Sequence, residues 1–197
     1  MRALVRAGAI TLLTGLLLAG GPATADRLVV ADANDTSGRM DIRRVIHGHL
    51  DASTVAHRVA TYRRWRSRML SAKGSGALSL IFSTEGNSCA EALVIVDLKD
   101  GRLRSRIRSY DPLGCGRGDD SGGFGEWRPI PQRPRRDNRR SITVFVPLDM
   151  LSKTELDQYR WSATTFFLQD GTPCSPHVCG DDAPDGGRER GLITHSL

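Results

Sequence analysis

The sequence has no long apolar run beyond its first 25 residues. Within that leader, Arg2 and Arg6 precede an apolar run over residues 7–19, and the small residues Ala23 and Ala25 close it. This order is typical of a secretory signal peptide, and the apolar run is too short to span a bilayer. We therefore expect residues 1–25 to be a signal peptide, with no transmembrane segment, and the mature protein to be secreted and extracellular.

Lysine is scarce, since only three of the 28 basic residues are lysines. Because this bias is typical of a GC-rich genome, the abundance of arginine alone indicates no function. The formal net charge of +6 falls to about +4 without the two leader arginines, and an excess of that size affects binding only where it is clustered.

Cysteine is limited to four residues. In an exported chain, cysteines indicate disulfide bonds. Cys89 and Cys115 flank a predicted hairpin, and Cys174 and Cys179 close a short loop, so we expect these two pairs. The alternative is a four-cysteine zinc site, which the export signal and the spacing of both pairs disfavour.

The chain also lacks a sustained helical period and any internal repeat. Short apolar alternations between turn residues instead predict about eight strands and at most a short helix at 149–155. The strands are expected at 28–31, 40–50 (with a bulge near Gly48), 54–62, 78–82, 92–98, 102–109, 142–146 and 159–168. This pattern predicts an all-β fold, an antiparallel β-sandwich or jelly roll, over 26–169. The Gly-, Pro- and Asp-rich segment 170–197 is expected to be a disulfide-pinned tail, and 111–140 a long irregular loop.

The clearest local prediction is a hairpin around Asp100-Gly101, a dipeptide that suits a two-residue turn with positive φ. Pairing across that turn sets Asp97 opposite Arg104 and Val94 opposite Ile107. Alternation then puts four arginines on one face of the second strand. They are Arg102, Arg104, Arg106 and Arg108, and we expect Asp97, Ile95, Leu93 and Glu91 to be their neighbours on the first strand.

Two further arginine clusters occur, at 58–68 around Tyr62 and Trp65 and at 128–140. These clusters are either a solvated basic surface or a binding surface for an anionic polysaccharide, a cell-wall polymer or phospholipid headgroups. Nucleic acid is not expected as a partner in vivo, because the chain is exported.

Oxygen-bearing side chains gather in the turn after the first strand. They are Asp32, Asn34, Asp35 and Asp41, which have the chemistry that Ca²⁺ prefers. The turn is not an EF-hand loop, because Gly38 comes one place late and Arg43 replaces the bidentate acid. The turn either satisfies its own backbone or binds calcium, with Asp181, Asp182 and Asp185 as distant contributors. No other cofactor is expected.

Two motifs imitate known functions. The run 119–123 resembles the serine motif of trypsin-like proteases and 54–57 their histidine motif, but 64 residues between His57 and Ser121 are too few for that fold, and Asp119 replaces a glycine. We expect no catalytic residue, and His57 on the apolar face of a strand is interpreted as structural. The tripeptide at 117–119 matches an integrin motif by chance.

The order of short motifs along the chain carries a resemblance. The opening is Asp32-x-Asn34-Asp35-x-x-Gly38-x-x-Asp41-Ile42, and the closing motifs are Tyr159-Arg160-Trp161 and Asp182-Ala183-Pro184-Asp185. The chain resembles secreted bacterial β-sandwich domains of unknown function and, more distantly, jelly-roll carbohydrate-binding and DOMON-type modules. The resemblance implies the architecture, but no sugar-stacking aromatic or haem ligand matches.

These observations favour a secreted, monomeric binding module whose ligand the sequence does not identify, with an anionic cell-wall or extracellular polymer as the candidate. The alternatives are an extracellular enzyme with an unrecognised site and a structural envelope protein without a ligand. A cleft with converging titratable groups would distinguish an enzyme from a binding module.

Overall fold

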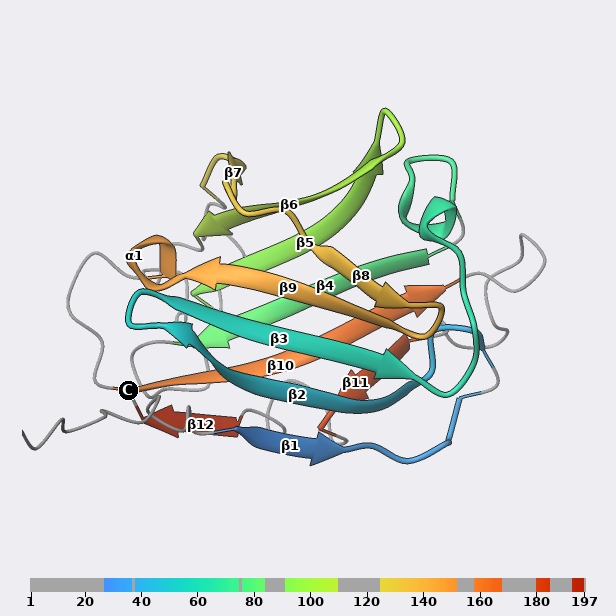
Figure 1. Cartoon of the computed structure of the whole chain (residues 1–197), viewed down its shortest axis with the longest axis horizontal. Coiled ribbons are helices and arrows are strands. Elements are labelled where there is room, and N and C mark those ends of the chain that lie inside the picture. The colour runs from blue at the N-terminus through green and yellow to red at the C-terminus, as the bar shows by residue number, and fades with distance from the viewer. Residues whose placement is uncertain are drawn as a thin grey trace, which may run out of the picture.

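The computed structural model describes residues 27–36, 38–74, 76–83, 91–109, 125–151, 158–167, 180–184 and 193–196. They form two antiparallel sheets that lie one over the other (Figure 1), with a 3-10 turn η1 (Ser67–Leu70) and a short helix α1 (Leu148–Leu151). The predicted all-β antiparallel sandwich is confirmed. All four cysteines and the segment 117–123 lie outside the described residues, so the disulfides stay predictions. In the part of the chain that is described, no helix is long and apolar enough to cross a membrane.

The first sheet has five strands in the order β1-β2-β3-β9-β8. Their bounds are β1 Leu28–Ala31, β2 Ile42–Asp51, β3 Thr54–Thr61, β8 Arg135–Asn138 and β9 Ser141–Pro147. The pairing of β2 with β3 shifts register between Ile42 and Arg44 and again between His49 and Asp51. The bulge expected near Gly48 therefore lies at the end of the strand.

The second sheet follows the order β11-β10-β4-β5-β6-β7, and β12 also pairs with β10. Its strands are β4 Gly76–Ser83, β5 Ala92–Lys99, β6 Arg102–Ser109, β7 Arg128–Pro129, β10 Gln158–Phe167, β11 Gly180–Ala183 and β12 Ile193–Ser196. The central β5 lies between β4 and β6, as its apolar residues on both faces indicated.

The hairpin of β5 and β6 has the predicted register, with Asp97 opposite Arg104 and Val94 opposite Ile107. Asp100 and Gly101 form its turn with φ values of 52° and 72°. Most residues other than glycine, asparagine and aspartate are strained in this region, so the Asp-Gly pair accounts for the turn and for the register that follows from it.

Four short strands go beyond the roughly eight that the pattern predicts. β7 and β8 lie within the segment 111–140 that we expected to be irregular, and β11 and β12 lie within the expected tail. Both parts of that tail pair with β10 and so belong to the sandwich. These strands span two to four residues and are held by backbone pairing to a neighbour, which needs no apolar alternation.

The sheets enclose a core whose largest fully buried side chains include Trp161, Tyr159 and Phe82. His47 and His57 are fully buried beside them and lie opposite each other on β2 and β3, with ring centroids 4.4 Å apart. The Tyr159 oxygen lies 2.9 Å from Nε2 of His47. His57 is therefore a core residue, buried more completely than the sequence indicated, and it does not face the surface as a protease histidine must.

Candidate functional sites

The alternate arginines of β6 lie on the side of the second sheet that is turned away from the core. Ser105 and Ile107 between them are buried, and successive residues of a strand point to opposite faces. We call Arg102, Arg104, Arg106 and Arg108 the arginine face. Its neighbours on β5 are Lys99, Asp97, Ile95 and Leu93. The expectation that Glu91 stands at one end is wrong, because that residue precedes β5.

Most side chains of the arginine face already contact other protein groups. Arg104 donates two hydrogen bonds to Asp97, one of them from Nη2 to Oδ2 at 3.1 Å. Nη2 of Arg106 lies 2.8 Å from the same carboxylate. The guanidinium carbons of Arg106 and Arg108 lie 5.2 and 4.5 Å from the ring centre of Trp127, within reach of a cation–π interaction. The sequence carried no signal for Trp127, which falls in the segment that we expected to be irregular.

Next to the arginine face, the outer surface of the second sheet forms a cavity of about 720 Å³. Apolar side chains of β4, β5 and β10 contribute to its lining, among them Ile81, Ile95 and Phe166. Arg104 and Arg106 line it from β6. Nε of Arg106 is buried and has no hydrogen-bond partner among the described residues. The cavity thus combines an apolar lining with the guanidinium-bearing side chains of Arg104 and Arg106.

Three arginines of the other two clusters, Arg58, Arg135 and Arg136, serve the fold. Arg136 donates to the carbonyl oxygens of Trp65 and Ser141 at 2.8 and 3.1 Å, and its guanidinium carbon lies 3.5 Å from the Trp65 ring centre. Burial lowers the pKa of Arg136 to about 10. Asp137 forms ion pairs with Arg58 and Arg135. These arginines are therefore tied to neighbouring strands.

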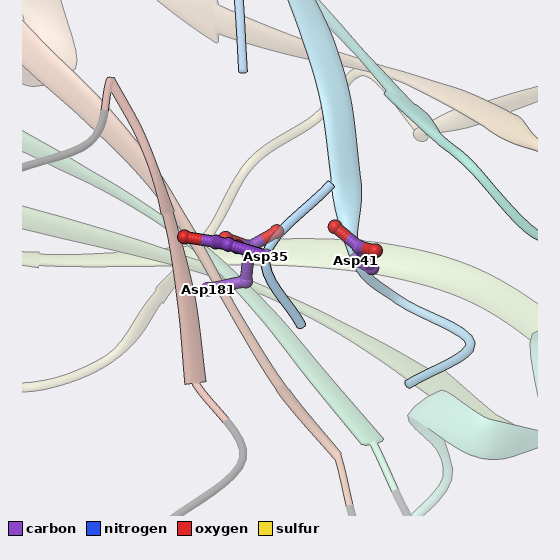
Figure 2. Close-up of side chains that lie close together, drawn as sticks. All are labelled: Asp35, Asp41 and Asp181. Atoms are coloured by element: carbon purple, nitrogen blue, oxygen red, sulfur yellow. The ribbon is translucent and has the colours of Figure 1, made fainter. Parts of the chain in front are cut away.

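A second charged region lies where the two sheets meet. Asp35 follows β1, Asp41 immediately precedes β2, and Asp181 belongs to β11 of the other sheet; Figure 2 shows the three carboxyl groups near one another. One oxygen of each lies within 4.8 Å of the others. We call these residues the acidic cluster. Two of the four calcium ligands expected in the turn thus come together with one of the distant contributors.

The described residues Asp32, Asn34 and Asp182 do not join the acidic cluster. Asp32 is buried outside it, where its carbonyl accepts a hydrogen bond from the Tyr62 hydroxyl at 2.8 Å. Asn34 is exposed. Asp182 lines the outer cavity instead, because neighbouring residues of β11 point to opposite faces. Asp185 lies outside the described residues.

Asp41 is the unusual member of the acidic cluster. It is 0% exposed, and neither carboxylate oxygen has a hydrogen-bond partner among the described residues. Burial and the charge of Asp35 raise the pKa of Asp41 to about 6, while Arg63 acts in the opposite direction. Asp181 is also buried, and its Oδ2 accepts a hydrogen bond from the backbone N–H of Ile42. The geometry therefore concentrates negative charge where water has little access.

Comparison of the chain with protein-family models, with curated proteins and with solved structures finds no match. The resemblance to secreted jelly-roll modules consequently stays a prediction beyond the sandwich architecture itself.

Proposed function

We propose that this protein is a secreted extracellular binding module and that the outer cavity of its second sheet holds an anionic ligand with an apolar part. The observation that carries the proposal is that Arg104 and Arg106 line the same cavity as Ile81, Ile95 and Phe166. A volume of about 720 Å³ is typical of small-molecule sites, which span roughly 300–1,000 Å³.

The distribution of charge gives the ligand an orientation. Lys99, Arg104 and Arg106 line the cavity on the side of β5 and β6, where Asp97 is the acid. Asp182 lines it from β11, which the sheet order separates from β6 by β10, β4 and β5. A carboxylate, phosphate or sulfate group therefore fits near β6, where charge-assisted hydrogen bonds from a guanidinium are available.

The apolar lining decides among the anionic partners considered from the sequence. A purely hydrophilic polysaccharide would leave Ile81, Ile95 and Phe166 in contact with water, whereas an acyl chain would cover them. Phe166 is 40% exposed, so this surface has apolar area to bury. The geometry favours an anionic amphiphile from the envelope, such as an acylated wall polymer or a lipid.

Isothermal titration with three probes tests both halves of the ligand. Dodecyl phosphate supplies head and chain, inorganic phosphate supplies the head alone, and dodecyl maltoside supplies the chain with a neutral head. We expect dodecyl phosphate to bind at least about tenfold more tightly than either of the others, because a charged hydrogen bond and apolar burial each contribute. Equal binding of dodecyl phosphate and dodecyl maltoside would remove the anionic part of the proposal.

The chain offers a matched pair of variants for the same titration. Arg106→Gln removes a guanidinium from the cavity lining, whereas Arg102→Gln removes one from the same face of the same strand that does not line the cavity. We expect Arg106→Gln to weaken binding of dodecyl phosphate about tenfold and Arg102→Gln to leave it unchanged. If both variants bind like the parent, the arginine face is not part of the site.

A further inference from the structure

The acidic cluster contains a buried carboxylate, that of Asp41, whose charge the described protein groups around it do not compensate. An ionised carboxylate that is buried without a partner is unfavourable, and like charges beside it make it more so. Asp41 has no ion pair among the described residues, although Arg63 exerts a weak attraction on it. The side chain must therefore either keep a proton or face a cation.

Three carboxylates that come together from separate parts of the chain favour a bound cation over a retained proton. A shared proton needs only two oxygens, whereas Asp35, Asp41 and Asp181 each direct one oxygen to the same place. Asp41 is fully buried, its carboxylate has no hydrogen-bond partner among the described residues, and it belongs to this group. We infer that the acidic cluster binds one calcium ion, which links the turn between β1 and β2 to strand β11.

The oxygen spacing is compatible with calcium. Two ligands that bind one ion at about 2.4 Å are at most about 4.8 Å apart, and calcium takes oxygen ligands at 2.3–2.6 Å. The three oxygens lie within 4.8 Å of one another. Magnesium requires shorter bonds, near 2.0–2.1 Å, and a stricter octahedron. Because Asp35 is exposed, water can complete the six to eight ligands that calcium takes.

Hydrogen bonds already hold the two sides of the site together. The Thr165 hydroxyl of β10 donates to the carbonyl of Met40 at 2.7 Å, and the Ile42 N–H donates to Asp181. The residues on both sides of Asp41 are thus attached to the second sheet, so little rearrangement is needed for a calcium ion to bind. The ion would fix the short β11 to the first sheet, a role independent of the ligand proposed for the outer cavity.

Thermal unfolding of the purified protein tests the inference. Protein stripped of metal with EDTA and exchanged into metal-free buffer at neutral pH is titrated with CaCl2 and, separately, with MgCl2. We expect Tm to rise with CaCl2 and to rise less with MgCl2. A parent Tm that stays constant up to about 10 mM CaCl2, ten times the weakest dissociation constant typical of extracellular calcium modules, would overturn the inference.

Three variants separate a calcium ligand from a structural residue. Asp41→Asn removes the buried charge, so it should raise Tm in metal-free buffer yet abolish the response to CaCl2. Asp35→Asn changes an exposed residue and should weaken calcium binding at least tenfold without impairing the fold. Asp182→Asn is the matched control, because it alters the neighbouring acid of β11 and should respond like the parent. If Asp41→Asn and Asp35→Asn respond to CaCl2 like the parent, the cluster does not hold the ion.

Hydrogen exchange supplies a readout at the site itself. In the parent, CaCl2 should slow the exchange of the backbone amides of β11, which an ion at Asp181 would hold against the first sheet. In Asp41→Asn the same amides should exchange at one rate with and without CaCl2. Unchanged exchange in the parent, despite a rise of Tm, would place the ion elsewhere in the protein.

Discussion

The acidic cluster and the arginine face each bring like charges together, but they differ in how far other protein groups compensate those charges. Arg104 and Arg106 share Asp97, and Arg106 and Arg108 lie over the ring of Trp127. The acidic cluster instead brings three carboxylates within 4.8 Å, two of them buried, and leaves Asp41 without a hydrogen bond among the described residues.

The difference follows from side-chain length. An arginine can cover apolar neighbours with its stem and carry its charge to water or to a partner several ångströms away. Aspartate holds its charge close to the backbone, so a buried aspartate must find its partner where the fold places it. Buried acids without partners are thus a stronger sign of a bound ion than exposed arginines are of a bound anion.

Asp181→Ala should produce the largest change in stability. In CaCl2 at about a hundred times the dissociation constant, it removes roughly 2.7 kcal/mol of linked binding energy. It also leaves the Ile42 N–H without its acceptor, which costs about 1–3 kcal/mol. We expect the free energy of unfolding in urea to fall by about 4 kcal/mol in total.

The same measurement in metal-free buffer distinguishes the two contributions of Asp181. There the calcium contribution should vanish, and the loss should shrink to that of the protein contacts of Asp181, which include the hydrogen bond from Ile42, partly offset by relief of the repulsion with Asp41. Asp182→Ala should cost little in either buffer, because that side chain faces away from the acidic cluster. An equal loss for Asp181→Ala with and without CaCl2 would mean that the residue stabilises the fold through its protein contacts and not through calcium.

The free energy of unfolding of the metal-free protein should depend on pH, because the ionised form of Asp41 is costly to bury. Its pKa is about 6 in the folded protein against 3.8 for an ordinary aspartate, so the folded state holds a proton that the unfolded state has lost. This contribution to stability is complete below about pH 4 and is lost as pH rises through about 6, which amounts to about 3 kcal/mol. Urea unfolding from pH 4 to 7 measures this contribution as the difference in the free energy of unfolding between the parent and Asp41→Asn.

Calcium should reverse the sign of that dependence. Because the ion binds the deprotonated carboxylate, it competes with the proton and stabilises the folded protein more as pH rises. A difference between the parent and Asp41→Asn that shows no slope with pH, in either buffer, would contradict the burial of a charged group there.

Arg136→Lys should cost about 2 kcal/mol in urea unfolding, because lysine retains the charge but loses the planar fork and the stacking on Trp65. Arg106→Lys is the comparison, since Arg106 lies on the outer face, is farther from its indole ring than Arg136 is, and shares Asp97 with Arg104. A smaller loss for Arg136→Lys than for Arg106→Lys would contradict the view that the cluster at 128–140 serves the fold.

Residue patterns predicted the fold where strand formers alternate over several residues. The hairpin register followed from Asp100-Gly101, and the inward residues of β10 followed from Trp161 and Phe167. By contrast β8 and β11 read RRDN and GDDA, which have no apolar face to detect. Their pairing depends on backbone edges that exist only once β9 and β10 are in place.

The acidic cluster was predictable only in part. Hard oxygen ligands in one turn pointed to calcium, and Asp181 was among the distant candidates. The path of the turn decides which side chains converge among Asp32, Asn34, Asp35 and Asp41. The choice of the inward face of β11 decides that Asp181, and not Asp182, joins them. Both are set by contacts between the sheets, and these contacts are not encoded in local spacing.

The smallest expected effect concerns the exposed end of the arginine face. Arg102 lies opposite Lys99 across the hairpin, and like charges directly opposite each other are mildly destabilising. Arg102→Glu should therefore raise Tm by only about 1 °C at low salt, and 1 M NaCl should remove the gain, because the screening length falls to about 3 Å. Arg102→Gln is the control, since it removes the repulsion without adding an attraction and should give a smaller rise.

A large effect at this site, comparable with that of Asp41→Asn in metal-free buffer, would show that exposure does not separate the two charged regions. A small one that salt abolishes supports the view that burial, rather than the number of like charges, makes the acidic cluster require an ion.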